Sequence, residues 1–190
     1  MADGFRPAPF DVVEASRRVW AERWGSEAAS GNAVFTAIVR ANQVLMQEVD
    51  RVMKAHGLTF TRYQVLTWLE SEPDSAARAL SWISTVLRVP PATVTNIIDR
   101  LEADGLVRRV PHPTDARTTL AEITGRGRTL ARATTVDLNE QVYSPLALEG
   151  PQREQVVSLL GDLRASSGEF DPTRSAERIA KLDQHRTSDA

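Results

Sequence analysis

The sequence predicts a mainly α-helical protein organised around a helix-turn-helix and a small β-hairpin that follows it. Three observations support this fold class. Two short segments with helical spacing of apolar residues lie between residues 80 and 104, separated by a turn at 88–90. Two stretches typical of strands flank a proline-rich tip between residues 106 and 123. Long segments with helical spacing precede and follow this centre.

The two helices of the helix-turn-helix have recognisable start and stop signals. Ser81 is a good N-cap residue, so we expect the first helix over residues 82–87. The fixed φ of Pro91 suits the first position of the second helix, which we expect to continue to residue 104. Gly105 would end this helix in the left-handed conformation. The buried face of the second helix would consist of Val94, Ile97, Ile98 and Leu101.

The expected hairpin has strands at residues 106–110 and 117–123 around a tip at 111–116. We name this hairpin the wing. A short strand at residues 77–80 is expected to pair with it. The arginines in or just beyond the wing are Arg108, Arg109, Arg117 and Arg126. A helix-turn-helix with such a wing can place one helix in the major groove of DNA and a hairpin beside it.

The centre of the chain resembles the MarR family of transcription regulators. The resemblance rests on the segments TVTNIIDRLEADGLVRR and PTDARTTLAEITGRGR, which are similar to the recognition helix and wing of that family. Asp115 and Arg117 match its wing-tip motif. Thr124, Gly127 and Arg128 match the entry to its next helix. The resemblance covers residues 33–163 and implies a winged helix-turn-helix DNA-binding lobe combined with long dimerisation helices.

The resemblance also suggests how the chain is divided. Residues 1–32 would form an N-terminal arm and an extra helix at 10–24, followed by a break at 25–32. Residues 33–165 would form the MarR-type domain. Residues 166–190 would form a polar, weakly held or disordered tail, in which residues 172–186 could be helical. Within the domain, we expect the DNA-binding lobe at about 59–124 and the dimerisation helices at 33–56 and 125–165. Uninterrupted helices are expected over 33–55, 60–70, 125–143 and 151–165.

Exposed positions of the second helix and the wing are candidate DNA contacts. The first turn of a helix in the major groove meets base edges, and an asparagine such as Asn96 suits adenine. The resemblance makes Arg117 the residue that enters the narrow minor groove. Asp115 would hold Arg117 or another wing arginine by accepting a charge-assisted hydrogen bond. Ser84, Thr95, Arg108 and Arg109 would suit phosphates. The full candidate set is Ser84, Pro91, Ala92, Thr93, Thr95, Asn96, Arg100, Arg108, Arg109, Asp115 and Arg117. The alternative is that these residues are solvated surface positions.

The resemblance further implies a cleft for a small aromatic or phenolic effector between the DNA-binding lobe and the dimerisation helices. The candidate lining residues are Trp20, His56, Tyr63, Trp68 and Trp82. Each of them has the alternative role of packing in the core. Binding of the effector would release DNA if the effector preferred the form that does not bind DNA.

The composition excludes several other classes of protein. The chain has no cysteine, so disulfides, thiolate metal sites and thiol-oxidation sensing are excluded. Its 23 basic and 25 acidic residues give a net charge of −2, so any basic DNA-binding surface must be local. Neither a membrane-spanning segment nor a signal peptide is evident, and we expect a cytoplasmic protein. No catalytic motif is apparent, and no cofactor or metal is expected.

The expected function is therefore that of a sequence-specific DNA-binding transcription regulator. The resemblance implies a homodimer on a palindromic double-stranded operator, most simply a repressor released by a small aromatic or phenolic ligand. The alternative is a winged-helix module that binds proteins without sequence-specific DNA binding. The basic wing with Asp115 and Arg117 favours the first interpretation.

Overall fold

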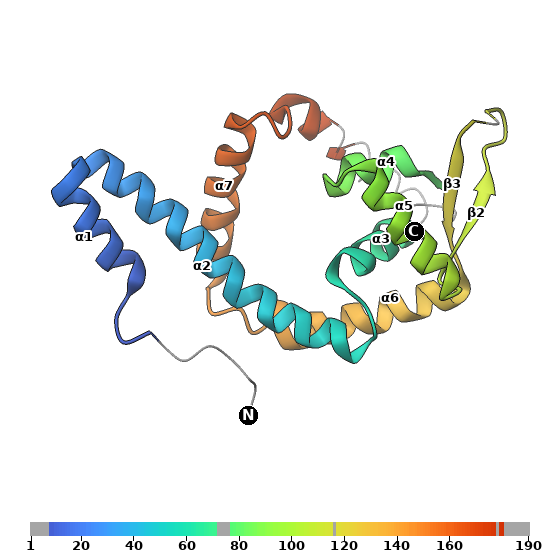
Figure 1. Cartoon of the computed structure of the whole chain (residues 1–190), viewed down its shortest axis with the longest axis horizontal. Coiled ribbons are helices and arrows are strands. Elements are labelled where there is room, and N and C mark those ends of the chain that lie inside the picture. Colours follow the sequence, from blue (N-terminus) through green and yellow to red (C-terminus); the bar gives the residue numbers. More distant parts are fainter. Residues whose placement is uncertain (1–7, 72–76, 116, 178, 181–190) are drawn as a thin grey trace. The chain divides into compact units, whose positions relative to one another are not determined.

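The structure is a computed structural model that describes residues 8–71, 77–115, 117–177, 179 and 180 (Figure 1). The chain divides into two units, Met1–Pro145 and Leu146–Ala190. The first unit contains helices α1 to α6, a π-helix and all three strands of the sheet, and the second contains helix α7. None of the helices in the described ranges combines the length and apolar character needed to cross a membrane.

Helices α1 (Val12–Trp24) and α2 (Ser26–Ala55) form a helical hairpin. They meet at Gly25, whose φ of 87° lies in the left-handed region that favours glycine. The predicted break over residues 25–32 was wrong, because only Gly25 interrupts the helices. The residues that follow Gly25 are held in α2 by packing against α1, where Ser16 Oγ donates a hydrogen bond to Asn32 Oδ1 at 2.7 Å.

The central lobe combines three helices with a three-stranded antiparallel sheet of order β1-β3-β2. The helices are α3 (Phe60–Glu70), α4 (Leu80–Leu87) and α5 (Pro91–Ala103). The strands are β1 (Arg78–Ala79), β2 (Val107–Pro111) and β3 (Thr119–Ile123). Strands β2 and β3 form the wing, with Val107 opposite Ile123, and β1 pairs with β3 through Arg78 opposite Ala121. The predicted wing and its additional strand are confirmed.

The start of α4 differs from the prediction. Ala79 occupies the N-cap position, and Ser81 lies inside the helix. The predicted N-cap at Ser81 was wrong because β1 leads directly into α4, and α4 has no side-chain cap. The end of α5 agrees with the prediction, since Gly105 has a φ of 69°. Its amide donates to the carbonyl of Glu102 at 2.9 Å, which closes the helix.

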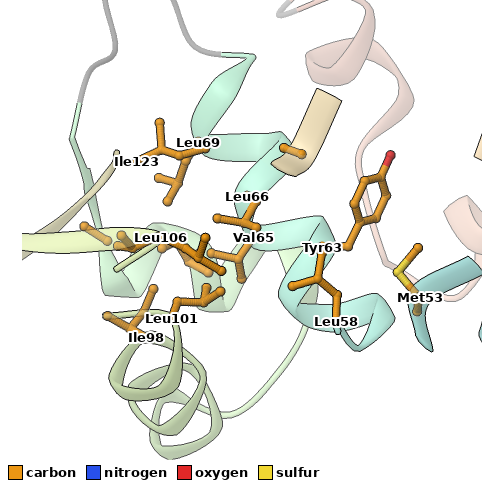
Figure 2. Packing of buried hydrophobic residues seen from close by; sticks show 14 of the residues in the cluster. Met53, Leu58, Tyr63, Val65, Leu66, Leu69, Ile98, Leu101, Leu106 and Ile123 are labelled. Atoms are coloured by element: carbon orange, nitrogen blue, oxygen red, sulfur yellow. The ribbon is translucent and has the colours of Figure 1, made fainter. Parts of the chain in front are cut away.

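One hydrophobic core holds the helices of the lobe against the sheet (Figure 2). Leu66 of α3 and both Ile98 and Leu101 of α5 are fully buried. Leu106 and Ile123 contribute from the wing side of the same cluster. Because α5 buries its apolar face here, its opposite face is left for solvent or a partner. Of the four residues predicted to be buried in α5, three are buried, and Ile97 is half-buried.

Thr124 is the N-cap of helix α6 (Gly125–Leu138), and its Oγ1 accepts a hydrogen bond from the amide of Gly127 at 3.0 Å. The helix continues into the π-helix η2 (Asn139–Tyr143), where the sequence predicted an uninterrupted α-helix. The change of helix type could not be seen in the apolar pattern. Leu138 and Val142 are both buried and are spaced as they would be in an α-helix.

The second unit contains helix α7 (Gly150–Ser166), which begins with a capping box formed by Glu149 and Gln152. Several large apolar side chains of α7 are exposed: Val156, Val157, Leu159 and Leu163. The predicted tail is helical at residues 172–177, and residues 181–190 lie outside the described part of the chain. Most of the expected arm (residues 1–7) and the segment 72–76 also lie outside it.

Candidate nucleic-acid interface

The turn between α4 and α5 is closed by hydrogen bonds to Ser84. The amide of Val89 donates to the carbonyl of Ser84 at 3.2 Å, and Ser84 Oγ donates to the carbonyl of Val89 at 2.7 Å. Arg88 lies between them with a φ of 52°. The Ser84 hydroxyl therefore stabilises the turn, and any phosphate would have to share it with Val89.

Helix α5 presents its N-terminal half to solvent. All the predicted contact positions on this helix are exposed: Pro91, Ala92, Thr93, Thr95, Asn96 and Arg100. Thr95 differs from the others because its Oγ1 donates to the carbonyl of Pro91 at 3.1 Å. A shallow depression of about 210 Å³ is lined by Thr59, Arg62, Thr93, Asn96, Ile97 and Arg100. It brings hydrogen-bonding and cationic groups together on one side of α5, a combination suited to base edges and phosphates.

Arg62 belongs to this surface and was missed by the sequence analysis. It lies in the first turn of α3, and its guanidinium forms an ion pair with Asp104 at the end of α5. Its Nε is buried and has no hydrogen-bond partner in the described part of the chain. The ion pair joins residues 42 positions apart, so no local sequence signal indicates it. The sequence shows only that Arg62 is a basic residue three positions after the N-cap Thr59.

The two arginines of strand β2 are engaged with carboxylates of the protein. Arg108 donates two hydrogen bonds of 3.0 Å to Glu122 on β3. Arg109 contacts Asp99 at 2.6 Å and also pairs with Glu102, both on α5. From the sequence, both arginines were expected to contact phosphates. A phosphate would have to compete with these carboxylates.

Glu102 connects α5 to strand β2 of the wing through two hydrogen bonds. Its carboxylate accepts a hydrogen bond from the backbone amide of Arg109 at 2.9 Å and another from the guanidinium of the same residue. The amide and then the guanidinium of Arg109 lower the pKa of the Glu102 carboxyl below its ordinary value of 4.5. This contact fixes the position of the wing relative to α5. A protein that contacts DNA with both the helix and the wing needs such a fixed arrangement.

We expect Glu102→Gln to reduce the stability of the protein at neutral pH but much less in acid. A lowered pKa in the folded state means that the ionised carboxyl stabilises the fold above its unfolded pKa. That stabilisation is lost as the pH falls through the lowered folded pKa. Urea denaturation of wild type and variant between pH 7 and pH 3 measures the difference. Glu22→Gln, at an exposed position of α1, is the control. If the difference in free energy of unfolding between wild type and Glu102→Gln stayed constant with pH, this role of Glu102 would be contradicted.

The wing tip is organised by Asp115. Its Oδ1 accepts from the backbone amide of Arg117 at 3.0 Å, and its Oδ2 accepts from the hydroxyl of Thr118 at 2.6 Å. The Thr118 hydroxyl and then the Arg117 amide lower the pKa of the Asp115 carboxyl. Asp115 therefore positions Arg117 through the main chain, whereas the sequence predicted a bond to the guanidinium of Arg117 or of another wing arginine. The side chain of Arg117 is exposed.

A cavity of about 350 Å³ lies between α3 and the π-helix η2. It is lined by Phe60, Tyr63, Gln64, Thr67, Trp68, Ser71 and Tyr143. The hydroxyls of Tyr63 and Thr135 are 2.9 Å apart and share a hydrogen bond. Burial raises the pKa of the Tyr143 phenol, with a smaller contribution from Tyr63, so this group is neutral near pH 7. The lining combines aromatic faces with uncharged hydrogen-bonding groups.

Two of the five predicted effector residues, Tyr63 and Trp68, line this cavity. Trp82 is not part of the lining, but its ring packs edge to face against that of Trp68 at a centroid distance of 6.1 Å. His56 lies instead between the end of α2 and α6, where its Nε2 is 2.6 Å from Oδ2 of Asp137. Trp20 is on α1, where its ring is 6.4 Å from that of Trp24. The structure therefore does not place Trp20 or His56 in the lining of the cavity.

Comparison with known proteins identifies the family. A family model described as MarR family matches residues 56–118. The fold is similar to that of Sco5413, a MarR family transcriptional regulator from Streptomyces coelicolor, with a TM-score of 0.67 and 39% identity. That match covers 75% of this chain and 98% of the Streptomyces chain. The chain belongs to the MarR family. Because this is a family of transcription regulators, the chain is classed as a regulator and not as an enzyme.

Two further relatives are similar over about half of this chain. The HTH-type transcriptional regulator MhqR of Bacillus subtilis is 30% identical over 94 residues, which are 50% of this chain and 63% of the relative. This chain thus spans less than two thirds of MhqR. The homoprotocatechuate degradative operon repressor of Escherichia coli is 26% identical over 109 residues, covering 57% and 72% of the two chains.

Proposed function

We propose that this MarR family member binds double-stranded DNA in a sequence-specific manner and regulates transcription from the bound site. In this proposal the exposed N-terminal half of α5 enters the major groove and Arg117 enters the adjacent minor groove. The observation that supports it most directly is the depression beside α5, which Arg62 lines together with the exposed Asn96 and Arg100. Asn96 would read base edges and Arg100 would contact phosphates, while Arg62 is paired with Asp104 and borders the same surface.

The bound form would be a homodimer on a palindromic operator. Large exposed apolar side chains on α2 support a second copy as the partner: Val34, Phe35, Ile38, Val39, Val44 and Leu45. Such a surface is unusual on a monomeric protein. Helix α7 carries further exposed apolar residues in its own unit. The two recognition helices would then contact half-sites about one helical turn apart. Action on DNA would place the protein in the cytoplasm.

The cavity beside Tyr63 and Trp68 would hold a small hydroxylated aromatic effector. Its volume of about 350 Å³ is within the range of small-ligand sites. Tyr63 and Tyr143 would donate or accept hydrogen bonds with ring hydroxyls, and the Trp68 ring would supply apolar contact. The name of the Escherichia coli relative refers to the degradation of such a compound, which supports this ligand class. An effector that prefers the DNA-free form would make the protein a repressor released by ligand.

A gel-shift assay with the DNA upstream of the gene tests this function. We expect a specific shift at 50 mM salt that weakens about 10-fold or more at 200 mM, because phosphate contacts release counterions. Adding a panel of phenols and aromatic acids should relieve the shift for one class of compound. Scrambled DNA of the same composition is the control. A dimer that binds neither its upstream DNA nor a selected dyad-symmetric library would contradict the proposal and favour the protein-binding alternative.

A further inference from the structure

The wing tip has a second organiser that neither the family match nor the proposed function assigns. His112 follows the last residue of β2, and its ring nitrogen Nδ1 lies 3.3 Å from the amide nitrogen of Thr114 and 3.1 Å from that of Asp115. The backbone amide of His112 itself donates to the carbonyl of Thr118 at 3.3 Å. His112 therefore contacts both sides of the tip.

The hydrogen bonds of the tip determine the protonation state of the imidazole. A backbone N–H can only donate, so Nδ1 must present its lone pair to Thr114 and Asp115. The ring proton of a neutral imidazole then resides on Nε2. A doubly protonated ring would have an N–H at Nδ1 facing these two amides, and both bonds would be lost. Pro113 has no amide proton and is compatible with this arrangement.

Two side chains thus accept hydrogen bonds from three amides in the described part of the tip. His112 receives those of Thr114 and Asp115, and the Asp115 carboxylate receives that of Arg117. The Thr118 amide donates to the carbonyl of Asp115 at 3.0 Å, which closes the turn. Because Asp115 is held by His112 and in turn holds Arg117, the conformation of the Arg117 backbone depends on the imidazole.

We propose that neutral His112 is a positioning residue for DNA binding, which folds the wing tip through Nδ1 and thereby presents Arg117 to the minor groove. This inference rests on the proposed function of the wing. It also implies that protonation of His112 loosens the tip. Among the described groups, the Asp115 carboxylate interacts electrostatically with the His112 ring and would attract a protonated imidazole.

Substitutions at position 112 test the proposal. His112→Asn keeps an acceptor oxygen close to the position of Nδ1, so it should bind DNA almost as wild type does. His112→Ala removes the acceptor, and His112→Gln places its amide one atom farther out. Each should weaken binding about 2- to 10-fold, the effect of losing hydrogen bonds of ordinary strength. Equal affinity of the Ala, Gln and wild-type proteins would overturn the proposal.

The pH profile separates positioning from a general structural role. Histidine is the side chain that ordinarily titrates between pH 5 and 8. We expect the DNA affinity of wild type to fall, relative to that of His112→Asn, as the pH is lowered from 8 to 5.5. His56 and His185 are present in both proteins, so the difference reports on His112 alone. A relative increase in wild-type affinity in acid would mean that the imidazolium contacts phosphate directly, and would overturn the proposal.

A measurement without DNA distinguishes failure of this inference from failure of the proposed function. In ¹⁵N NMR spectra of the free protein, Nδ1 of His112 should have the shift of an unprotonated nitrogen. The amide hydrogens of Thr114 and Asp115 should exchange with solvent faster in His112→Ala than in wild type. If wild type binds no DNA, the proposed function fails. The role of His112 would be overturned, whether or not DNA is bound, by a protonated Nδ1 or by unchanged hydrogen exchange of the two amides. If wild type binds and Arg117→Ala weakens binding while His112→Ala does not, only the inference fails.

Discussion

Arg117→Ala is expected to weaken binding to the operator by about 1–3 kcal/mol, or roughly 5- to 150-fold in affinity. Arg117 is exposed at the wing tip, and no carboxylate of the described residues forms an ion pair with its guanidinium. Arg108 and Arg109, in contrast, are already paired with Glu122, Asp99 and Glu102. An unpaired guanidinium at a hairpin tip can enter a narrow minor groove without first breaking an internal contact.

Fluorescence anisotropy with a labelled operator at two salt concentrations measures this effect. Arg117→Lys separates charge from shape, because lysine keeps the charge but loses the planar guanidinium. Arg18→Ala is the control for net charge, since Arg18 lies on α1 and is highly exposed. If Arg117→Ala bound as tightly as Arg18→Ala, the wing would not contribute to recognition, and α5 alone would have to account for it.

Gly127→Ala is expected to destabilise the protein by about 1–3 kcal/mol or more, since overpacking of a tight site forces the backbone to shift. A Cβ on Gly127 would clash with the Leu106 carbonyl oxygen and would lie only 2.8 Å from Cγ1 of Ile123. The first of these atoms is main chain and cannot rotate away. The same carbonyl also accepts from the amide of Thr124 at 3.0 Å, so moving it would disturb the junction of the wing and α6.

Gly125→Ala is the matched control for this variant. Gly125 is the first residue of the same helix, and a Cβ there would meet no atom within 4 Å. We expect the control to be neutral or to stabilise the protein by up to about 1 kcal/mol, because alanine reduces the entropy of the unfolded chain. Urea denaturation at fixed protein concentration compares the two variants. Similar midpoints for both would show that the contact between α6 and the wing tolerates a methyl group.

The features that the sequence predicted well depend on neighbouring residues. Pro91 begins α5, Gly105 ends it, and the wing follows, each as expected. These signals are local because a fixed φ, a left-handed glycine and a short turn act within a few residues of the chain. The apolar spacing of α5 identified its buried face for the same reason. The candidate DNA contacts on α5 follow directly, since they occupy the opposite face.

Other features were decided only by the tertiary structure. The polar stretch after Gly25 became helical because α1 packs beside it and Ser16 bonds to Asn32. Arg62 joined the candidate interface because folding brings the start of α3 to the end of α5. Arg108 and Arg109 form ion pairs with carboxylates of the protein, although the sequence predicted phosphate contacts for both. The reason is that the partner of a charged side chain depends on which elements pack together. Charges act across space, so the sequence determined which arginines are present, and the fold determined which of them are available to bind DNA.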